Sequence, residues 1–205
     1  MNRRIWDFWA NKYERLWVQK VSLEPTRRLI IDKLNQNKIL KSKISILDMG
    51  CGTGQLLREV GAACEGMNLT GVDISLKMID AAACHGGNIH YVSSDILSYD
   101  QGQYDLILCS HSFPYYPQKE EAIQKLYHLL KPEGWLFLAQ ACENSLYDKF
   151  IMTLVKLTAG RAKYWGNKKM EHQLLKVLAS VETCQVPTKA YMPSIQLFIC
   201  RKDEM

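Results

Sequence analysis

The sequence has no apolar run long enough to cross a membrane, and we expect no secretory leader at its start. A membrane-spanning helix needs about 18 or more consecutive apolar residues, and every apolar run in this chain is far shorter. The stretch from Met1 to Asp7 contains two arginines and a tryptophan instead of the apolar core of a signal peptide. We therefore expect a cytoplasmic protein with no membrane contact.

Cysteine occurs in no pattern that indicates a metal site or a disulfide framework. The seven cysteines are scattered, none forms a C-x-x-C pair, and their number is odd. His85 and His90 flank two glycines, but no further ligand completes a set at the usual spacing. We predict no metal site, and the free thiols fit a reducing compartment.

The chain also lacks internal repeats, low-complexity tracts and any lysine or arginine run longer than two. Residues 1–44 hold 11 basic and 4 acidic side chains, residues 45–143 hold 5 and 12, and residues 144–205 hold 10 and 5. Two basic flanks are compatible with nucleic-acid binding, but their interleaving with apolar residues favours solvated helix faces. A length of 205 residues with 47% apolar composition is typical of one globular domain.

The most informative stretch is a short apolar run that ends at an acid and three glycines. Residues 44–47 have the composition of a buried strand. After Gly54, apolar residues recur at helical spacing, with Thr53 as a candidate cap or first-turn residue. The pattern predicts a strand, a tight loop and a helix.

This loop favours a cationic ligand over a pyrophosphate. It reads Asp48-x-Gly50-x-Gly52-x-Gly54 and continues with Gln55, whereas a dinucleotide loop reads G-x-G-x-x-G. Glycines allow close approach, and we expect several free backbone N–H groups and a helix N-terminus to face the ligand. An acid at the strand end would repel pyrophosphate and pair with an ammonium group. A nicotinamide-dependent oxidoreductase is therefore the weaker alternative.

Beyond this loop, strands and helices alternate, which predicts a mostly parallel sheet covered on both faces. We expect strands near 44–48, 68–72, 88–92, 104–109 and 134–141, helices near 54–64, 76–84 and 118–130, a mainly helical stretch at 145–180, and a strand pair at 181–186 and 195–200.

Two helices are expected before the sheet. The first spans residues 5–21, and we expect one of its faces to belong to the core. The large residues on that face are Trp6, Trp9, Tyr13, Leu16 and Trp17. The second has Pro25 in its first turn and extends to about Leu40.

Taken in order, these motifs resemble the class I, Rossmann-like S-adenosylmethionine (SAM) dependent methyltransferases, in particular the small-molecule "methyltransferase type 11"-like members. The glycine loop is similar to their motif I, Asp73 ends a second strand 19 positions after Gly54, and Asp95-Ile96 follow a third strand. The resemblance extends over about residues 44–140 through a fourth strand and the Lys131–Gly134 turn.

The resemblance implies an α/β, doubly wound, mostly parallel seven-stranded sheet with an antiparallel C-terminal strand, helices on both faces and an N-terminal helical cap. It implies one domain, 1–205, divided into a cap (1–43), a SAM-binding core (44–141), and a helical insert with a C-terminal strand pair (142–205). It also implies SAM as cofactor and S-adenosylhomocysteine (SAH) as product. The implied cofactor residues are Asp48, Gly50, Cys51, Gly52 and Gly54 at the methionine part, Asp73 and Ile74 at the ribose, Asp95 and Ile96 at the adenine, and Ser110 beside the methionine through its backbone.

Methyl transfer from a sulfonium needs mainly positioning and exclusion of water, so few residues are obligatory. The loop 109–117 should border the transferred methyl, because ligands bind at the carboxyl ends of strands in such sheets. There, His111 is a candidate general base or a structural histidine. Tyr13 is a second catalytic candidate near the methionine or substrate end, because its W-x-x-x-A-x-x-Y setting is similar to the cap helix of small methyltransferases, which folds over the SAM cleft and is the alternative to core packing for these aromatic residues. Tyr115 and Tyr116 either line a pocket or pack the loop.

We expect the acceptor to be a small molecule. The Asn/Asp-Pro-Pro-aromatic motif of many enzymes that methylate amino nitrogens of nucleic acid and protein is absent after the fourth strand. An RNA methyltransferase and a non-catalytic SAM-binding protein remain alternatives. The sequence specifies neither the acceptor atom nor whether the protein is a monomer or a homodimer.

Overall fold

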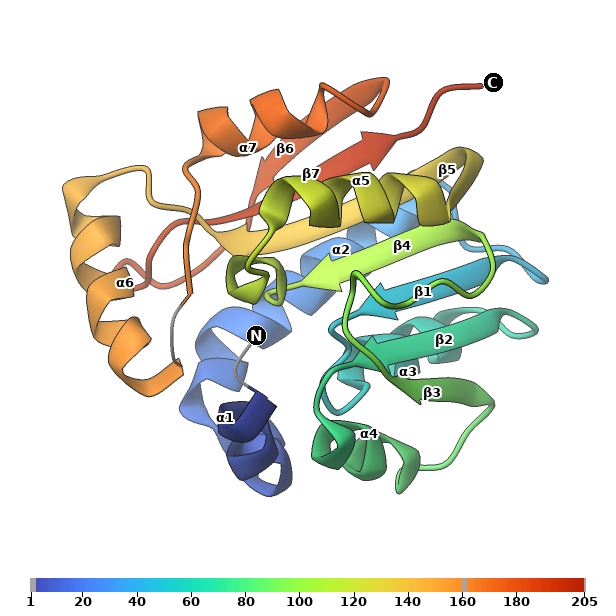
Figure 1. The fold of residues 1–205 in the computed structure, drawn as a ribbon, viewed down its shortest axis with the longest axis horizontal. Helices are drawn as coiled ribbons and strands as arrows, with labels where there is room; N and C mark the ends of the chain where they lie inside the picture. The colour runs from blue at the N-terminus through green and yellow to red at the C-terminus, as the bar shows by residue number, and fades with distance from the viewer. Residues whose placement is uncertain (1–2, 160–161, 205) are drawn as a thin grey trace.

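The computed structural model describes residues 3–159 and 162–204, with the side chains of 154–159 excluded. A seven-stranded sheet forms its centre (Figure 1). The strands are β1 (Ser45–Met49), β2 (Asn68–Asp73), β3 (Ile89–Ser93), β4 (Tyr104–Ser110), β5 (Leu130–Ala141), β6 (Ser180–Gln185) and β7 (Ile195–Arg201). The helices are α1 (Arg3–Trp9), α2 (Glu24–Gln36), α3 (Gln55–Ala63), α4 (Leu76–Ala83), α5 (Lys119–Leu129), α6 (Leu146–Ala159) and α7 (Asn167–Leu174), with shorter turns η1 (Ala10–Arg15), η2 (Gln19–Leu23) and η3 (Phe113–Tyr115).

The strand order is β3-β2-β1-β4-β5-β7-β6, and β7 alone runs antiparallel to its two neighbours. The fold class predicted from the sequence, including the reversed C-terminal strand, is confirmed. From β1 the chain first adds β2 and β3 on one side of the sheet, and then crosses over to place β4 on the other side, where β4 pairs directly with β1. In open α/β sheets such a switch point opens a crevice at the carboxyl ends of the strands.

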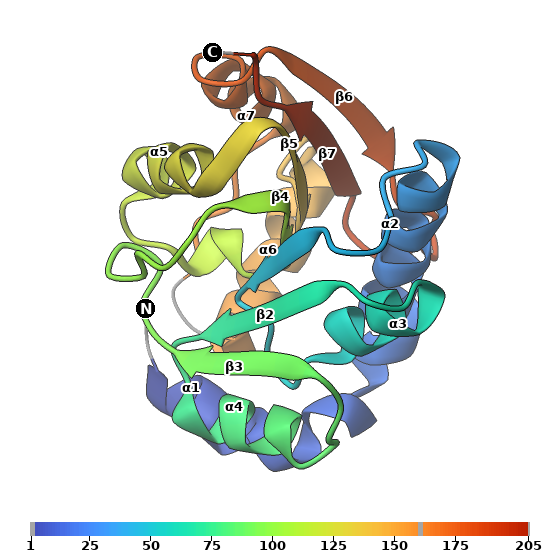
Figure 2. The ribbon, with the colours of Figure 1, turned by 90° about the vertical axis from the view of Figure 1, so that its right-hand side faces the viewer.

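Alternate residues of the central strands face two separate hydrophobic layers. Leu47 and Ile107 contact the layer that contains α5 and α7, whereas Ile46 and Leu106 contact the layer that contains α2 and α3. Figure 2 shows these two helix pairs on opposite sides of the sheet. Because both faces are buried, the strands read as continuous apolar runs instead of alternating ones.

The N-terminal region differs from the prediction of one helix over residues 5–21. The chain is helical in α1, tightens into a 3-10 turn, becomes extended at Leu16 and then resumes as a π-turn that leads into α2. α1 has no buried residue and Trp17 is exposed, so the expected core stripe is wrong. The cap of residues 1–43 stays a prediction, and within it α2 buries Ile30 and Leu34 in the hydrophobic layer on its side of the sheet.

The turn expected at residues 131–134 is a bulge inside β5. The preceding helix ends at Leu129, as predicted, but the strand begins at once, and the pairing with β4 shifts register after Leu130. Glu133 has a positive φ of 58°, a conformation that is uncommon outside glycine. Pro132 is tolerated because the ladder is interrupted there.

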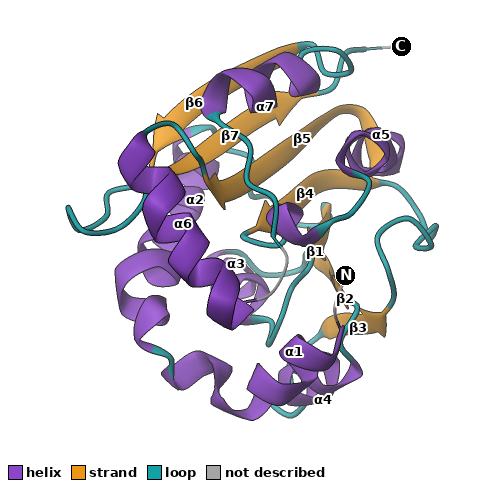
Figure 3. Cartoon of the chain, turned by 60° about the vertical axis from the view of Figure 1, so that its left-hand side comes forward, coloured by secondary structure: helices purple, strands orange, loops and turns teal. Residues whose placement is uncertain are grey.

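The stretch 145–180 is mainly helical, as expected. Figure 3 shows α6 beside the carboxyl ends of the parallel strands and apart from α5. Its N-terminus is attached to the start of β7 through the buried carboxylate of Asp148, which accepts hydrogen bonds from Ser145 N (3.0 Å) and Ser194 N (2.8 Å). Within the described residues, no helix combines the length and apolar character of a membrane span.

We predict that Asp148→Ala lowers the free energy of unfolding by about 2–4 kcal/mol, because several buried donors lose a charged acceptor. Asp148→Asn keeps one carbonyl oxygen and should lose about half as much. Urea denaturation measures both values, with the exposed Asp32→Asn as the matched control. Equal stability of Asp148→Ala and the control would contradict this role.

Candidate functional site

The candidate site lies where the chain leaves β1 and β4, at the switch point of the sheet. Two adjoining cavities of about 50 Å³ each open there. Both are lined by Tyr13, Gly50, Gly52 and Ser110. The first adds Leu23, Arg27, Asp48, Cys51, Thr53, Gln55 and Leu56, and the second adds Trp6, Asp73, Met78, His111, Ser112 and Tyr115.

The glycine loop has little hydrogen-bonding capacity left for a ligand. Gly50 N and Cys51 N both donate to Val72 O, Gly52 N donates to the carboxylate of Asp73, and Gly54 N donates to Cys51 O. The expectation of free N–H groups is therefore wrong for these four residues of the loop. Gly50 itself is required because its φ is +86° and a Cβ there would lie 2.3 Å from Ser112 Cβ. The loop offers close approach and no phosphate cradle.

Asp48, at the end of β1, is 2% exposed, and its Oδ1 has no hydrogen-bond partner among the described residues. Burial, together with the nearby carboxylate of Asp73, raises the pKa of Asp48 to about 8. A buried acceptor without a donor is unfavourable. A cationic donor in the first cavity would satisfy this carboxyl group and keep it ionised.

Arg27 of α2 lines the same cavity as Asp48 and was not singled out from the sequence. Its Nε donates to Glu59 at 2.8 Å and its Nη1 to Gln19 Oε1 at 3.1 Å, so the guanidinium is held in place. The missed signal was positional: Arg27 stands three and seven residues before Ile30 and Leu34, on the buried face of α2. A charged residue on a buried helix face is an indicator of a specific partner.

Asp73 lies at the end of β2 and lines the second cavity. Its Oδ2 accepts from Gly52 N at 3.0 Å and its Oδ1 from Ser75 N at 2.8 Å. Burial raises the pKa of Asp73 even though these bonds oppose the shift. Each carboxylate oxygen retains further acceptor capacity, so Asp73 both shapes the loop and can accept from a ligand hydroxyl.

His111 follows β4 and reaches α2. Its Nε2 lies 2.9 Å from Thr26 Oγ1, and its backbone has a φ of +60°. Burial, with the Arg27 cation as a second cause, lowers the pKa of His111 to about 4. The imidazole is thus neutral at physiological pH and lines the second cavity.

An aromatic wall closes the second cavity. The ring of Trp6 packs edge-on against Tyr115 (4.9 Å between centroids) and faces Tyr13 at 6.5 Å. Of the loop tyrosines, Tyr115 lines the cavity, whereas Tyr116 is buried and donates to Met49 O at 3.1 Å. The N-terminal segment therefore covers the switch point.

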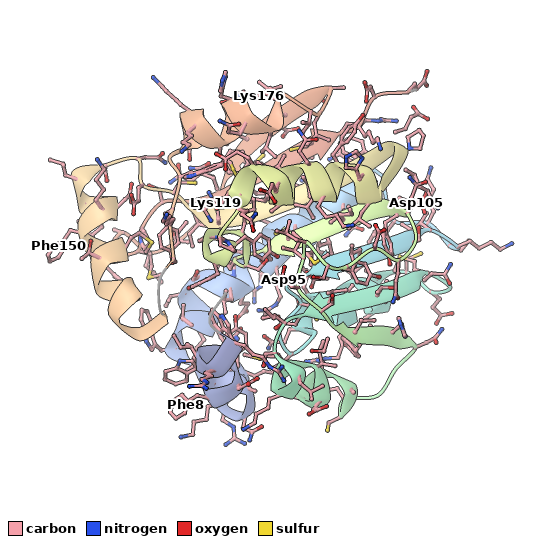
Figure 4. The ribbon with its side chains drawn as sticks, in the orientation of Figure 1. Phe8, Asp95, Asp105, Lys119, Phe150 and Lys176 are labelled. Carbon is pink, nitrogen blue, oxygen red and sulfur yellow. The ribbon has the colours of Figure 1, made fainter. Side chains whose placement is uncertain are left out.

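The other predicted cofactor residues do not line either cavity. Gly54 is packed against Tyr91, Ile74 follows β2, and Asp95 and Ile96 follow β3, with Asp95 Oδ1 accepting from Leu97 N at 3.0 Å. Figure 4 shows Asp95 near the middle of the molecule and Asp105 at the far end of β4. Asp105 is structural, as expected, because it binds Ser45 N and Lys131.

The cysteine thiols near the loop are free and buried. All seven cysteines are free, and burial raises the pKa of both Cys51 and Cys109, the two nearest the loop. Over the described ranges, no three His, Cys, Asp or Glu side chains are grouped so that they could hold a metal ion.

Comparison with known proteins gives consistent matches. A family model described as a methyltransferase domain matches residues 23–183. A ubiquinone biosynthesis O-methyltransferase of Coxiella burnetii is 35% identical over 128 residues, which are 60% of this chain and 53% of that protein. The chain thus spans about half the length of the curated relatives it matches.

Solved structures share the fold over nearly the whole chain. The N-methyltransferase NodS of Bradyrhizobium japonicum WM9, in complex with SAH, superposes with a TM-score of 0.77 at 19% identity, covering 98% of each chain. The magnesium protoporphyrin IX methyltransferase ChlM of Synechocystis PCC 6803, with bound SAH, superposes with a TM-score of 0.75 at 20% identity, covering 99% of this chain and 100% of that one.

We predict that Asp48→Asn stabilises the protein in the absence of ligands. The pKa of Asp48 is raised from 3.8 to about 8 on folding, so the stability that its proton provides is complete below about pH 4 and is lost as the pH rises towards 8. At pH 7 the variant should therefore melt several degrees higher, since about 1 kcal/mol corresponds to about 2–4 °C at this chain length.

Thermal denaturation at pH 4, 6 and 8 measures this difference, which should disappear at pH 4. The exposed Asp80→Asn serves as the control and should follow the wild type at every pH. A melting temperature of Asp48→Asn at or below that of the wild type at pH 7 would contradict the burial argument.

Proposed function

The chain belongs to the methyltransferase domain family, and on that premise we propose that it transfers a methyl group from SAM to a small-molecule acceptor and releases SAH. The main support for this proposal is the Oδ1 atom of Asp48, which has no hydrogen-bond partner among the described residues and lies in the cavity that Arg27 also lines. An acid and a guanidinium in one small cavity suit the ammonium and carboxylate groups of an amino acid. The methionine part of SAM has both groups.

The loop geometry supports this ligand over a dinucleotide. The N–H groups of Gly50, Cys51, Gly52 and Gly54 are already used within the protein, so a pyrophosphate would find no donor among these four and would lie beside the carboxyl group of Asp48. A sulfonium ligand needs no such donors. This argument disfavours the oxidoreductase alternative.

The remaining cofactor assignments follow the family resemblance. Asp73 would accept from the ribose hydroxyls with the acceptor capacity that its loop bonds leave. Asp95 and Ile96 would bind the adenine, and Ser110 would border the methionine through its backbone. When bound, SAM supplies a methyl carbon made electrophilic by its positively charged sulfur.

The residues of the second cavity would handle the acceptor. His111, neutral in this environment, would take the proton of the acceptor. Tyr13 and Trp6, with Trp6 packed edge-on against Tyr115, would exclude water by covering the crevice. The aromatic lining suits a small planar or apolar acceptor.

The names of the relatives support a small acceptor, since they include enzymes of ubiquinone and magnesium protoporphyrin metabolism. The RNA alternative depends on the basic flanks. Several of these charges are paired within the protein, among them Arg27 with Glu59 and Lys33 with Glu182. The structure therefore offers less free basic surface than the sequence suggested.

We expect calorimetry to show micromolar binding of SAM and SAH and no binding of NADH. Binding of the ammonium group requires ionised Asp48, so affinity should rise between pH 6 and pH 8, by up to about tenfold per pH unit. Asp48→Asn should bind far more weakly and lose the pH dependence. Binding of NADH alone would make the oxidoreductase reading the better one.

We predict that His111→Ala reduces turnover by about 10²–10⁴-fold, the usual contribution of a general base, while SAH affinity is unchanged. The assay uses the acceptor that screening of metabolite extracts for methyl incorporation identifies. His90→Ala, an exposed histidine outside the site, is the matched control. Equal turnover of His111→Ala and the control would assign His111 a structural role.

A further inference from the structure

Thr26 and His111 are 85 residues apart in sequence but form one buried polar pair. Thr26 lies in the first turns of α2 and is fully buried, and His111 follows β4. The distance from Thr26 Oγ1 to His111 Nε2 is 2.9 Å. α2 thus contacts the candidate general base directly.

The direction of this hydrogen bond follows from a second contact of Thr26. Its Oγ1 lies 2.8 Å from Ser22 O, a carbonyl oxygen that can only accept. A hydroxyl group has one proton, and at 2.8 Å two oxygens without a proton between them would repel each other. Thr26 therefore donates to Ser22 O and accepts from Nε2–H of His111.

The backbone also fixes His111. Its φ of +60° is uncommon for a residue with a Cβ, and its N–H donates to Ala139 O at 2.7 Å. Such strain persists only where the surroundings impose it, and it is frequent at functional sites. Burial, and secondly the guanidinium of Arg27, lower the pKa of His111, so the ring remains neutral and its tautomer is a defined property.

The other ring nitrogen is available. Among the described residues, none forms a hydrogen bond with Nδ1, and His111 lines the cavity that also includes Trp6 and Tyr115. A neutral imidazole with its proton on Nε2 has its lone pair on Nδ1. Nδ1 is thus the ring nitrogen of His111 that can accept a proton.

We propose that Thr26 is a positioning residue that holds His111 in its Nε2–H tautomer and so makes Nδ1 the atom that accepts the proton of the methyl acceptor. This inference rests on the proposed function. The acceptor's O–H or N–H bond breaks and its proton bonds to Nδ1. The electron pair left on the acceptor forms the bond to the methyl carbon as the carbon–sulfur bond breaks onto sulfur. The proton then leaves His111 for solvent, since Arg27 disfavours the charged ring.

The test is nitrogen NMR of ¹⁵N-histidine-labelled protein, in which protonated and unprotonated ring nitrogens have well-separated shifts. The His111 signals are assigned by their absence in His111→Ala. We expect wild type and Thr26→Ser to show a protonated Nε2 and an unprotonated Nδ1. Thr26→Val should lose this state and populate the Nδ1–H tautomer.

The matched control is Thr153→Val, because Thr153 makes the same helix bond, Oγ1 to Lys149 O at 2.8 Å, and lies on the exposed side of α6. It should leave the His111 signals unchanged. An Nδ1–H tautomer in wild type, or an unchanged tautomer in Thr26→Val with a folded amide spectrum, would overturn the proposal.

Two further readouts separate this inference from the proposed function. Thr26→Val should lower kcat about tenfold with SAH affinity unchanged, and Thr26→Ser should restore kcat. If SAH does not bind to the wild type, the proposed function fails. If SAH binds and the tautomer is wrong, only the role of Thr26 fails.

Discussion

The site depends on a carboxyl group that is buried without a partner. Asp48 is the penultimate residue of β1, in its buried part Ile46–Met49, and the loop that follows uses its own N–H groups on Val72 O and Asp73 instead of on Asp48. The surrounding protein therefore leaves one strong acceptor unsatisfied, at a cost to stability. Arg27, Asp73 and the glycine loop are arranged around this acceptor, and each is held by bonds to other parts of the chain.

The sheet could be predicted from the sequence because its signals are local. Residues 44–47 and 104–109 are apolar runs bounded by glycines or polar residues, and the reversed strand β7 follows the family resemblance. The break at Leu16 could not be predicted, because the spacing of Trp6, Trp9 and Tyr13 fits a continuous amphipathic helix equally well. The spacing fits core packing and a cap over the cleft alike, and the tertiary structure shows that Trp6 and Tyr13 line the crevice.

The site could be predicted only where its residues belong to a motif. Asp48, Gly50 and Asp73 stand at fixed positions after strands, whereas Arg27 and Thr26 come from a helix that has no motif of its own. That helix has two roles. Ile30 and Leu34 pack in the core. Near its start, Arg27 lines the first cavity and Thr26 contacts His111. Long-range contacts of this kind leave no local pattern in one sequence.

The N-terminal segment is held over the crevice by polar contacts more than by core packing, and this has a kinetic consequence. Asp7 accepts from Ser75 Oγ at 2.6 Å, and Glu14 pairs with Arg58 at 2.9 Å. Residues 3–15 bury only Ala10, and their connection to α2 is extended at Leu16. In the proposed reaction, Tyr13 borders both cavities, so the wall that receives the acceptor is complete only after the segment has closed over the cofactor. Substrates would then bind in a compulsory order, and release of the spent cofactor would wait for the segment to lift.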